Sequence, residues 1–106
     1  MPSFSTRALI RWDSHTPEKK KYIYEERITL WKAKDADEAF KKSEKEALRY
    51  AKGGGNKYLG FIQSYCLFDD IEADGIEVFS LLRESDLSPK KYIDTHFDTG
   101  GEKQRK

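Results

Sequence analysis

The chain has 106 residues, of which 37% are apolar and 37% are charged, a composition suited to one compact domain with a modest core. Lysine and arginine total 20 against 19 aspartate and glutamate residues, so no chain-wide field favours nucleic acid or an anionic membrane. No apolar stretch approaches the roughly 18 residues of a membrane span, and the first residues lack the pattern of a secretion signal.

The first predicted element is a strand over residues 4–12, where apolar side chains recur with a period of two. These apolar positions are Phe4, Ala8, Ile10 and Trp12. Residues 13–21, with three consecutive lysines, are typical of a connection, and residues 22–33 are rich in aromatic and β-branched side chains. We expect a hairpin. Imperfect alternation in its second strand predicts a bulge, or burial of both faces near Trp31.

A helix is predicted next. Asp35 offers a capping oxygen, and Glu38 follows three residues later, as in a capping box. Phe40 and Ala47 fall on the apolar side and are expected to face the sheet. The three glycines at 53–55 end the helix. They follow a helix rather than precede one and lack the Gly-Lys-Ser/Thr ending, which argues against a phosphate loop.

Two further strands, over residues 58–68 and 76–81, are predicted to form a second hairpin with its turn at Asp74 and Gly75. Both strands are apolar on both parities, which is typical of strands covered on both faces. One helix of about 17 residues covers only one side of a four-stranded sheet. The second face therefore needs another cover, either residues 87–97 folding back or a second protein surface.

A short helix is expected from Ser88 and Pro89, because proline suits the first helical turn. Tyr92, Ile93 and Phe97 are its predicted apolar contacts. The fold class is therefore α+β: a four-stranded, mostly antiparallel sheet in the order strand-strand-helix-strand-strand, with one long helix on one face. Residues 1–98 form a single domain, and residues 99–106 are expected to be a disordered tail.

Six short motifs resemble the small bacterial family catalogued as domain of unknown function 4288. They are EERI at 25–28, WKA at 31–33, DEA at 37–39, YLG at 58–60, LFD at 67–69 and GIEVFS at 75–80. The likeness covers roughly residues 4 to 87. It implies a bacterial protein of one small domain, with no established activity and no residue role to carry over.

The residues that carry chemistry are scattered. Glu25 and Glu26 are adjacent in a strand and point to opposite faces, so they cannot converge on one substrate; ion pairing with Arg7 or Arg11 is the expected role. His15 and His96 lie in apparent loops near opposite ends of the chain. No Ser-His-Asp order, zinc spacing or dinucleotide fingerprint appears, so we predict no catalytic residue, cofactor or metal.

Two other features invite a functional interpretation. Residues 70–75 resemble the opening of a calcium loop, but Leu81 stands where a bidentate glutamate must close the site, so a hairpin turn explains them better. Cys66 is the only cysteine and sits in an apolar stretch, which predicts a buried structural side chain and a reducing, cytoplasmic setting.

The leading functional hypothesis is a non-catalytic protein-binding module that uses an uncovered sheet face or an edge strand, conceivably an immunity-type inhibitor of a bacterial toxin. The candidate anchors are large aromatic residues, which dominate binding energy at interfaces. They are Trp31, Phe61, Tyr65 and Phe79, each with a core role as the competing interpretation. Self-association through the same face, as a homodimer, is expected if no other partner covers it.

The alternative hypothesis is an RNA-binding module that stacks bases on aromatic side chains of the sheet. The candidates are Tyr22, Tyr24, Tyr58 and Tyr65, with Lys19, Lys20 and Lys21 holding phosphates. The near-neutral charge of the chain is the main argument against it.

Overall fold

The computed structural model describes residues 2–67, 75–97 and 103–105, with the backbone alone at 76, 78, 79 and 103–105. Seven elements occur along the described chain. In order they are β1 (Ser3–Arg11), β2 (Tyr22–Lys32), α1 (Ala36–Gly53), β3 (Lys57–Leu67), β4 (Ile76–Ser85), α2 (Pro89–His96) and β5 (Lys103–Arg105).

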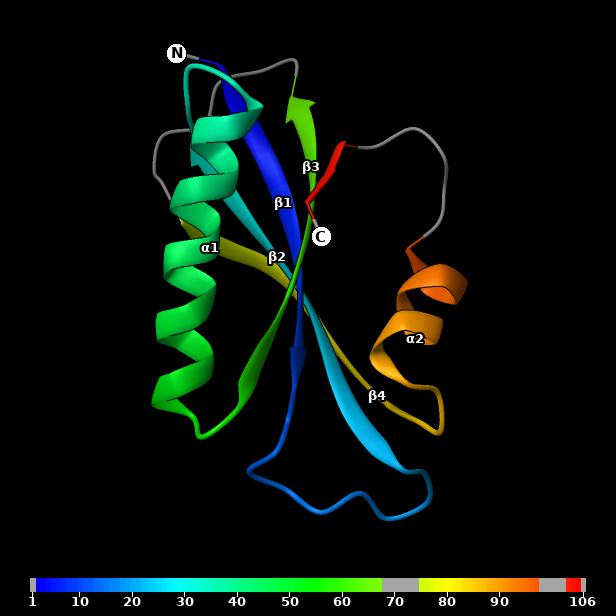
Figure 1. Cartoon of the computed structure of the whole chain (residues 1–106). Helices are drawn as coiled ribbons and strands as arrows, with labels where there is room; N and C mark the ends of the chain where they lie inside the picture. The colour runs from blue at the N-terminus through cyan, green and yellow to red at the C-terminus, as the bar shows by residue number, and fades with distance from the viewer. Residues whose placement is uncertain (1, 68–74, 98–102, 106) are drawn as a thin grey trace.

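The strands form one antiparallel sheet in the spatial order β4-β2-β1-β3-β5, with a helix on each side (Figure 1). The α+β class, the four main strands and the long helix are as predicted. The tail prediction is wrong for Lys103–Arg105, which pair with residues 62–64 of β3. Three residues can add to an open strand edge through backbone hydrogen bonds alone, so no side-chain pattern announces them.

The predicted second hairpin is also wrong. β3 pairs with β1, whereas β4 pairs with β2, so the β1–β2 pair separates them. Local turn residues can indicate a reversal of the chain, but they carry no information on which sheet edge the next strand joins. Of the predicted turn, Asp74 lies outside the described residues; Gly75 has a φ of 72° and donates its N–H to the Leu30 carbonyl at 2.5 Å.

α1 covers one face of the sheet (Figure 1). The Asp35 side chain accepts the Glu38 N–H at 2.9 Å, so the predicted cap is confirmed. Phe40 and Ala47 are buried and pack with Ala8, Ile10 and Ile62, as the helical periodicity predicts. α1 ends at Gly53.

α2 covers the opposite face (Figure 1). Its helix begins at the predicted place, with Ser88 as the capping residue and Pro89 in the first turn. The core on this side consists of Leu9, Tyr24, Phe61, Tyr92 and Phe97. Of the two covers that the sequence allowed, the structure shows the chain's own segment. The other cover that the sequence allowed, a second protein surface, is not needed where α2 lies, because Tyr92 and Phe97 already fill that space.

β2 is the strand with the imperfect alternation. Four consecutive residues at its centre, from Tyr24 to Arg27, are buried, because β2 lies inside the sheet and each face carries a helix. Both faces of β2 are thus buried at Tyr24–Arg27, whereas around Trp31, where this was predicted, buried and half-buried residues alternate. The extra residue lies in the partner strand: Ile28 opposes Phe79, but Thr29 opposes Glu77.

Candidate functional site

Glu25 and Glu26 are the most deeply buried carboxylates in the described chain, at 2% and 4% exposure. The two side chains point to opposite faces of β2, as predicted, so one lies under α1 and the other under α2. A buried carboxylate is costly unless hydrogen bonds and charges replace its water. The donors around each glutamate therefore decide what it can do.

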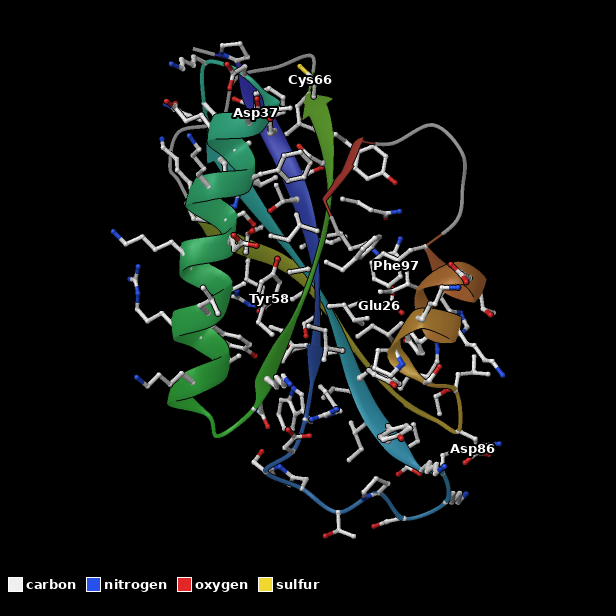
Figure 2. All side chains as sticks on the ribbon, viewed as in Figure 1. Glu26, Asp37, Tyr58, Cys66, Asp86 and Phe97 are labelled. Carbon is white, nitrogen blue, oxygen red and sulfur yellow. The ribbon has the colours of Figure 1, made fainter. Side chains whose placement is uncertain are left out.

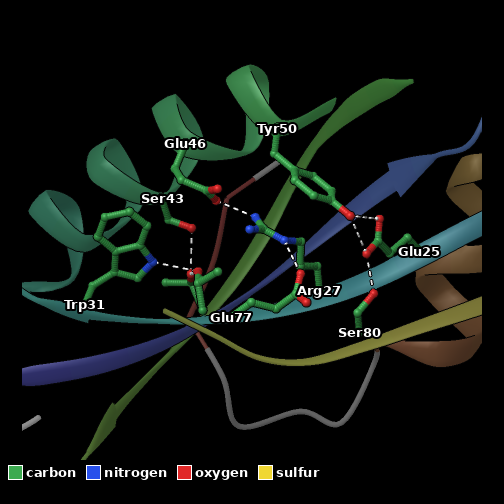
Figure 3. Close-up of polar contacts among 10 residues, drawn as sticks. Glu25, Arg27, Trp31, Ser43, Glu46, Tyr50, Glu77 and Ser80 are labelled. Atoms are coloured by element: carbon green, nitrogen blue, oxygen red, sulfur yellow. Dashed lines mark hydrogen bonds and ion pairs between the residues drawn. The ribbon is translucent and has the colours of Figure 1, made fainter. Parts of the chain in front are cut away.

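Under α1, Glu25 is surrounded by neutral donors (Figure 3). Its carboxylate accepts the Trp12 Nε1–H at 2.8 Å, the Tyr50 hydroxyl at 3.0 Å and the Ser80 hydroxyl. Burial, followed by the hydrogen bond to Glu25, raises the pKa of Tyr50 to about 12. Tyr50 therefore stays protonated and keeps donating across the whole physiological range.

Arg27 lies beside this cluster. Its guanidinium pairs with Glu46 of α1 and with Glu77 of β4, the latter at 2.5 Å, and lies 3.8 Å from the centre of the Tyr50 ring (Figure 3). Burial opposes the charge of Arg27, but the hydrogen bonds that Arg27 donates to the two carboxylates outweigh this effect and raise its pKa. Arg27 therefore links α1 to β2 and β4, and two carboxylates balance its charge.

Under α2, Glu26 is surrounded by cations. It pairs with Arg7 at 2.5 Å and Arg83 at 2.8 Å, and it accepts the Tyr92 hydroxyl at 2.6 Å. The predicted pair with Arg7 is confirmed, whereas Arg11 pairs with Asp13 at 2.6 Å. Glu26 lies between the sheet and α2 (Figure 2).

The same cluster fastens the end of α2. Arg7 donates to the His96 carbonyl at 3.0 Å, and its guanidinium lies 3.8 Å from the centre of the Phe97 ring. The His96 ring packs against the Tyr92 ring at a tilt, with 4.5 Å between the centroids. Burial, and then the charge of Arg83, lower the pKa of His96. His96 closes α2 rather than lying in a loop, and its environment is that of a packed residue.

Other reactive residues are not brought together in the described chain. The Ser14 hydroxyl donates to Asn56 Oδ1 at 2.7 Å, so the 3.0 Å contact with His15 Nδ1 gives the histidine no serine proton to take. Cys66 is exposed near the end of β3 (Figure 2), which corrects the prediction of a buried thiol. No group of three or more His, Cys, Asp or Glu side chains in the described chain could hold a metal ion.

The four predicted anchors lie in different environments. Trp31 and Phe61 are 7% and 1% exposed and belong to the interior, the competing role in the sequence interpretation. Tyr65 is 39% exposed. Phe79 opposes Ile28 in the sheet, and its side chain lies outside the described residues. Tyr65 is thus the one of these four whose described side chain a partner can reach.

The outer side of α1 carries a feature that sequence reasoning missed. We define the α1 outer strip as its exposed residues after the first turn: Lys41, Lys45, Leu48, Arg49 and Lys52. The intervening acids are turned away, since Glu44 accepts the Tyr58 hydroxyl at 3.0 Å and Glu46 pairs with Arg27. The sequence shows mixed charges along this helix, and only the contacts of Glu44 and Glu46 reveal that the outside is cationic.

Comparisons with models of protein families, with curated proteins and with solved structures give no match. The resemblance to domain of unknown function 4288 therefore stays a prediction. No helix in the described chain is long and apolar enough to cross a membrane.

Proposed function

We propose that this domain is a non-catalytic protein-binding module that recognises an acidic protein surface through the α1 outer strip. The observation that carries the proposal is the separation of charge on α1. Four cations of the strip pair with no carboxylate among the described residues, although the chain as a whole has a net charge of only +1. Such a local field accelerates and orients encounter with an oppositely charged partner.

Leu48 favours a protein over a nucleic acid as the partner. It is 54% exposed in the middle of the cations, so the strip offers an apolar anchor as well as charge. Binding to phosphates requires the charge alone.

Two of the four tyrosines named for the RNA-binding alternative are not available for stacking. Tyr24 and Tyr58 are buried. Two acids lie against the loop with the three lysines. Glu84 accepts the backbone N–H groups of Lys19 and Lys20 at 2.7 and 2.8 Å. Asp86 Oδ2 lies 3.8 Å from Lys20 Nζ. Self-association through the strip is disfavoured too, because two cationic surfaces repel each other.

Capture of partners from a bacterial lysate tests the proposal. The strip variant carries Lys45→Glu, Arg49→Glu and Lys52→Glu. The control variant carries Lys34→Glu, Lys90→Glu and Lys91→Glu, which are exposed, lie outside the strip and change the net charge equally.

We expect a protein that the wild type and the control variant retain, that the strip variant loses, and that ribonuclease does not release. Equal retention by both variants, or release by ribonuclease, would overturn the proposal. Loss on Tyr65→Ala with retention by the strip variant would do so as well, because it would place the partner on the sheet. The narrower proposal is a toxin inhibitor that acts in the reducing interior of a bacterial cell. It requires the retained protein to be a toxin.

A further inference from the structure

A groove lies at the C-terminal end of α1. Figure 1 shows the chain turning from this end of α1 into β3. It has a volume of about 500 Å³. Its floor is formed by Leu48, Ala51 and Tyr58, and three cations border it: Arg49, Lys52 and Lys57. Leu48, Arg49 and Lys52 also belong to the α1 outer strip, so the groove continues this strip over its apolar position.

The floor is held in place before any partner arrives. Tyr58 lies between α1 and the sheet (Figure 2), and its hydroxyl donates to Glu44 at 3.0 Å, which fixes the ring. Asn56, in the turn between α1 and β3, accepts the Ser14 N–H at 3.0 Å. The small side chain of Ala51 leaves the hollow between Leu48 and Tyr58. A preformed pocket costs a partner less ordering entropy than one that must be assembled.

The cations at the border of the groove determine which charge a ligand must carry to bind there. Arg49 and Lys52 pair with no carboxylate in the described chain. Lys57 is exposed at the start of β3, and after the hydrogen bond from Arg11 its charge further lowers the pKa of Asp13. An occupant must therefore bring carboxylates to the border and an apolar side chain to the floor. Two copies of this chain cannot meet groove to groove, because both borders are positive.

We propose that this groove binds an acidic segment of a protein partner and holds one large apolar side chain of that segment against Leu48, Ala51 and Tyr58. This inference rests on the proposed function and narrows it to a class of ligand. Leu48 determines the specificity for the apolar side chain, and the three cations supply the electrostatic part of the affinity.

Fluorescence anisotropy with two labelled synthetic peptides tests the inference at about 50 mM salt, where surface charges are weakly screened. The first peptide has glutamates flanking a central phenylalanine, and the second replaces the phenylalanine by serine. We expect the phenylalanine peptide to bind the wild type at least ten-fold more tightly than the serine peptide. Leu48→Asn should remove that difference, and Lys52→Glu with Lys57→Glu should weaken both peptides at least ten-fold.

The variants change exposed residues, and circular dichroism shows whether each remains folded. Equal binding of the two peptides, still lost in the strip variant, would overturn the groove inference and support the proposed function. No binding of either peptide would overturn the groove inference whatever the lysate capture gives. Tighter binding of polyuridylate than of the phenylalanine peptide would overturn both.

Discussion

The charged residues inside this protein differ from those on the outside of α1. Glu25 and Glu26 are buried, and each accepts three donors from the surrounding elements. The α1 outer strip is exposed, and its four cations have no carboxylate partner among the described residues. The buried charges hold the helices on the sheet, whereas the exposed ones are available to another molecule. The exposed, unpaired cations of the strip are therefore a better indication of a binding surface than the adjacent glutamates that stand out in the sequence.

Glu26→Ala should have the largest effect on stability. It leaves Arg7 and Arg83 without their carboxylate and Tyr92 without its acceptor. We expect a loss of about 3 kcal/mol in the free energy of unfolding, by analogy with other buried ion pairs broken on one side. Urea unfolding measures it. A loss below about 0.5 kcal/mol, the usual range for surface positions, would remove Glu26 from the residues that hold α2 in place.

Glu25→Gln should cost less, about 1–2 kcal/mol, because the amide keeps one acceptor oxygen for three neutral donors and no cation loses a partner. Trp12 is one of those donors, so its fluorescence should change in the folded variant. Tyr50→Phe is the matched control, since it removes one donor and leaves the carboxylate intact. A cost for Glu25→Gln equal to that of Glu26→Ala would contradict the distinction between neutral and cationic surroundings.

Glu84 adds a third case to the comparison, because it is partly exposed and yet accepts three backbone N–H groups. Backbone N–H groups of Glu18, Lys19 and Lys20 hold its pKa below the ordinary value of 4.5. The folded state thus favours the carboxylate, and its hold on the loop is present above pH 4.5 and is lost as the pH falls through the lowered value. NMR shifts of the Lys19 and Lys20 amides should titrate below pH 4.5 in the wild type and not in Glu84→Gln. Titration at or above that pH would show that the contact is absent in solution.

Sequence patterns predicted the features that depend on residues close together in the chain. Strand alternation placed Glu25 and Glu26 on opposite faces, and the capping residues Asp35 and Ser88 marked the helix starts. The pairing of β3 and β4 was predicted wrongly, because adjacency in a sheet depends on packing over the whole domain. Cys66 was expected to be buried from its apolar neighbours, yet it lies near the end of β3 and is exposed.

The candidate site was the least predictable part. The sequence pointed to large aromatics, and Trp31 and Phe61 are buried. The α1 outer strip depends on where Glu44 and Glu46 point, which is set by Tyr58 on β3 and Arg27 on β2. No spacing within the helix encodes those contacts.

The most direct test measures stability and partner binding on one preparation of the protein. The free energy of unfolding and the retention of the partner are both measured for the strip variant. We expect retention to be lost while the free energy of unfolding stays within about 1 kcal/mol of the wild type, since exposed substitutions away from structural contacts have small effects. Undiminished retention, or a loss of retention that follows only from unfolding, would contradict the assignment of the outer surface of α1 as the binding surface.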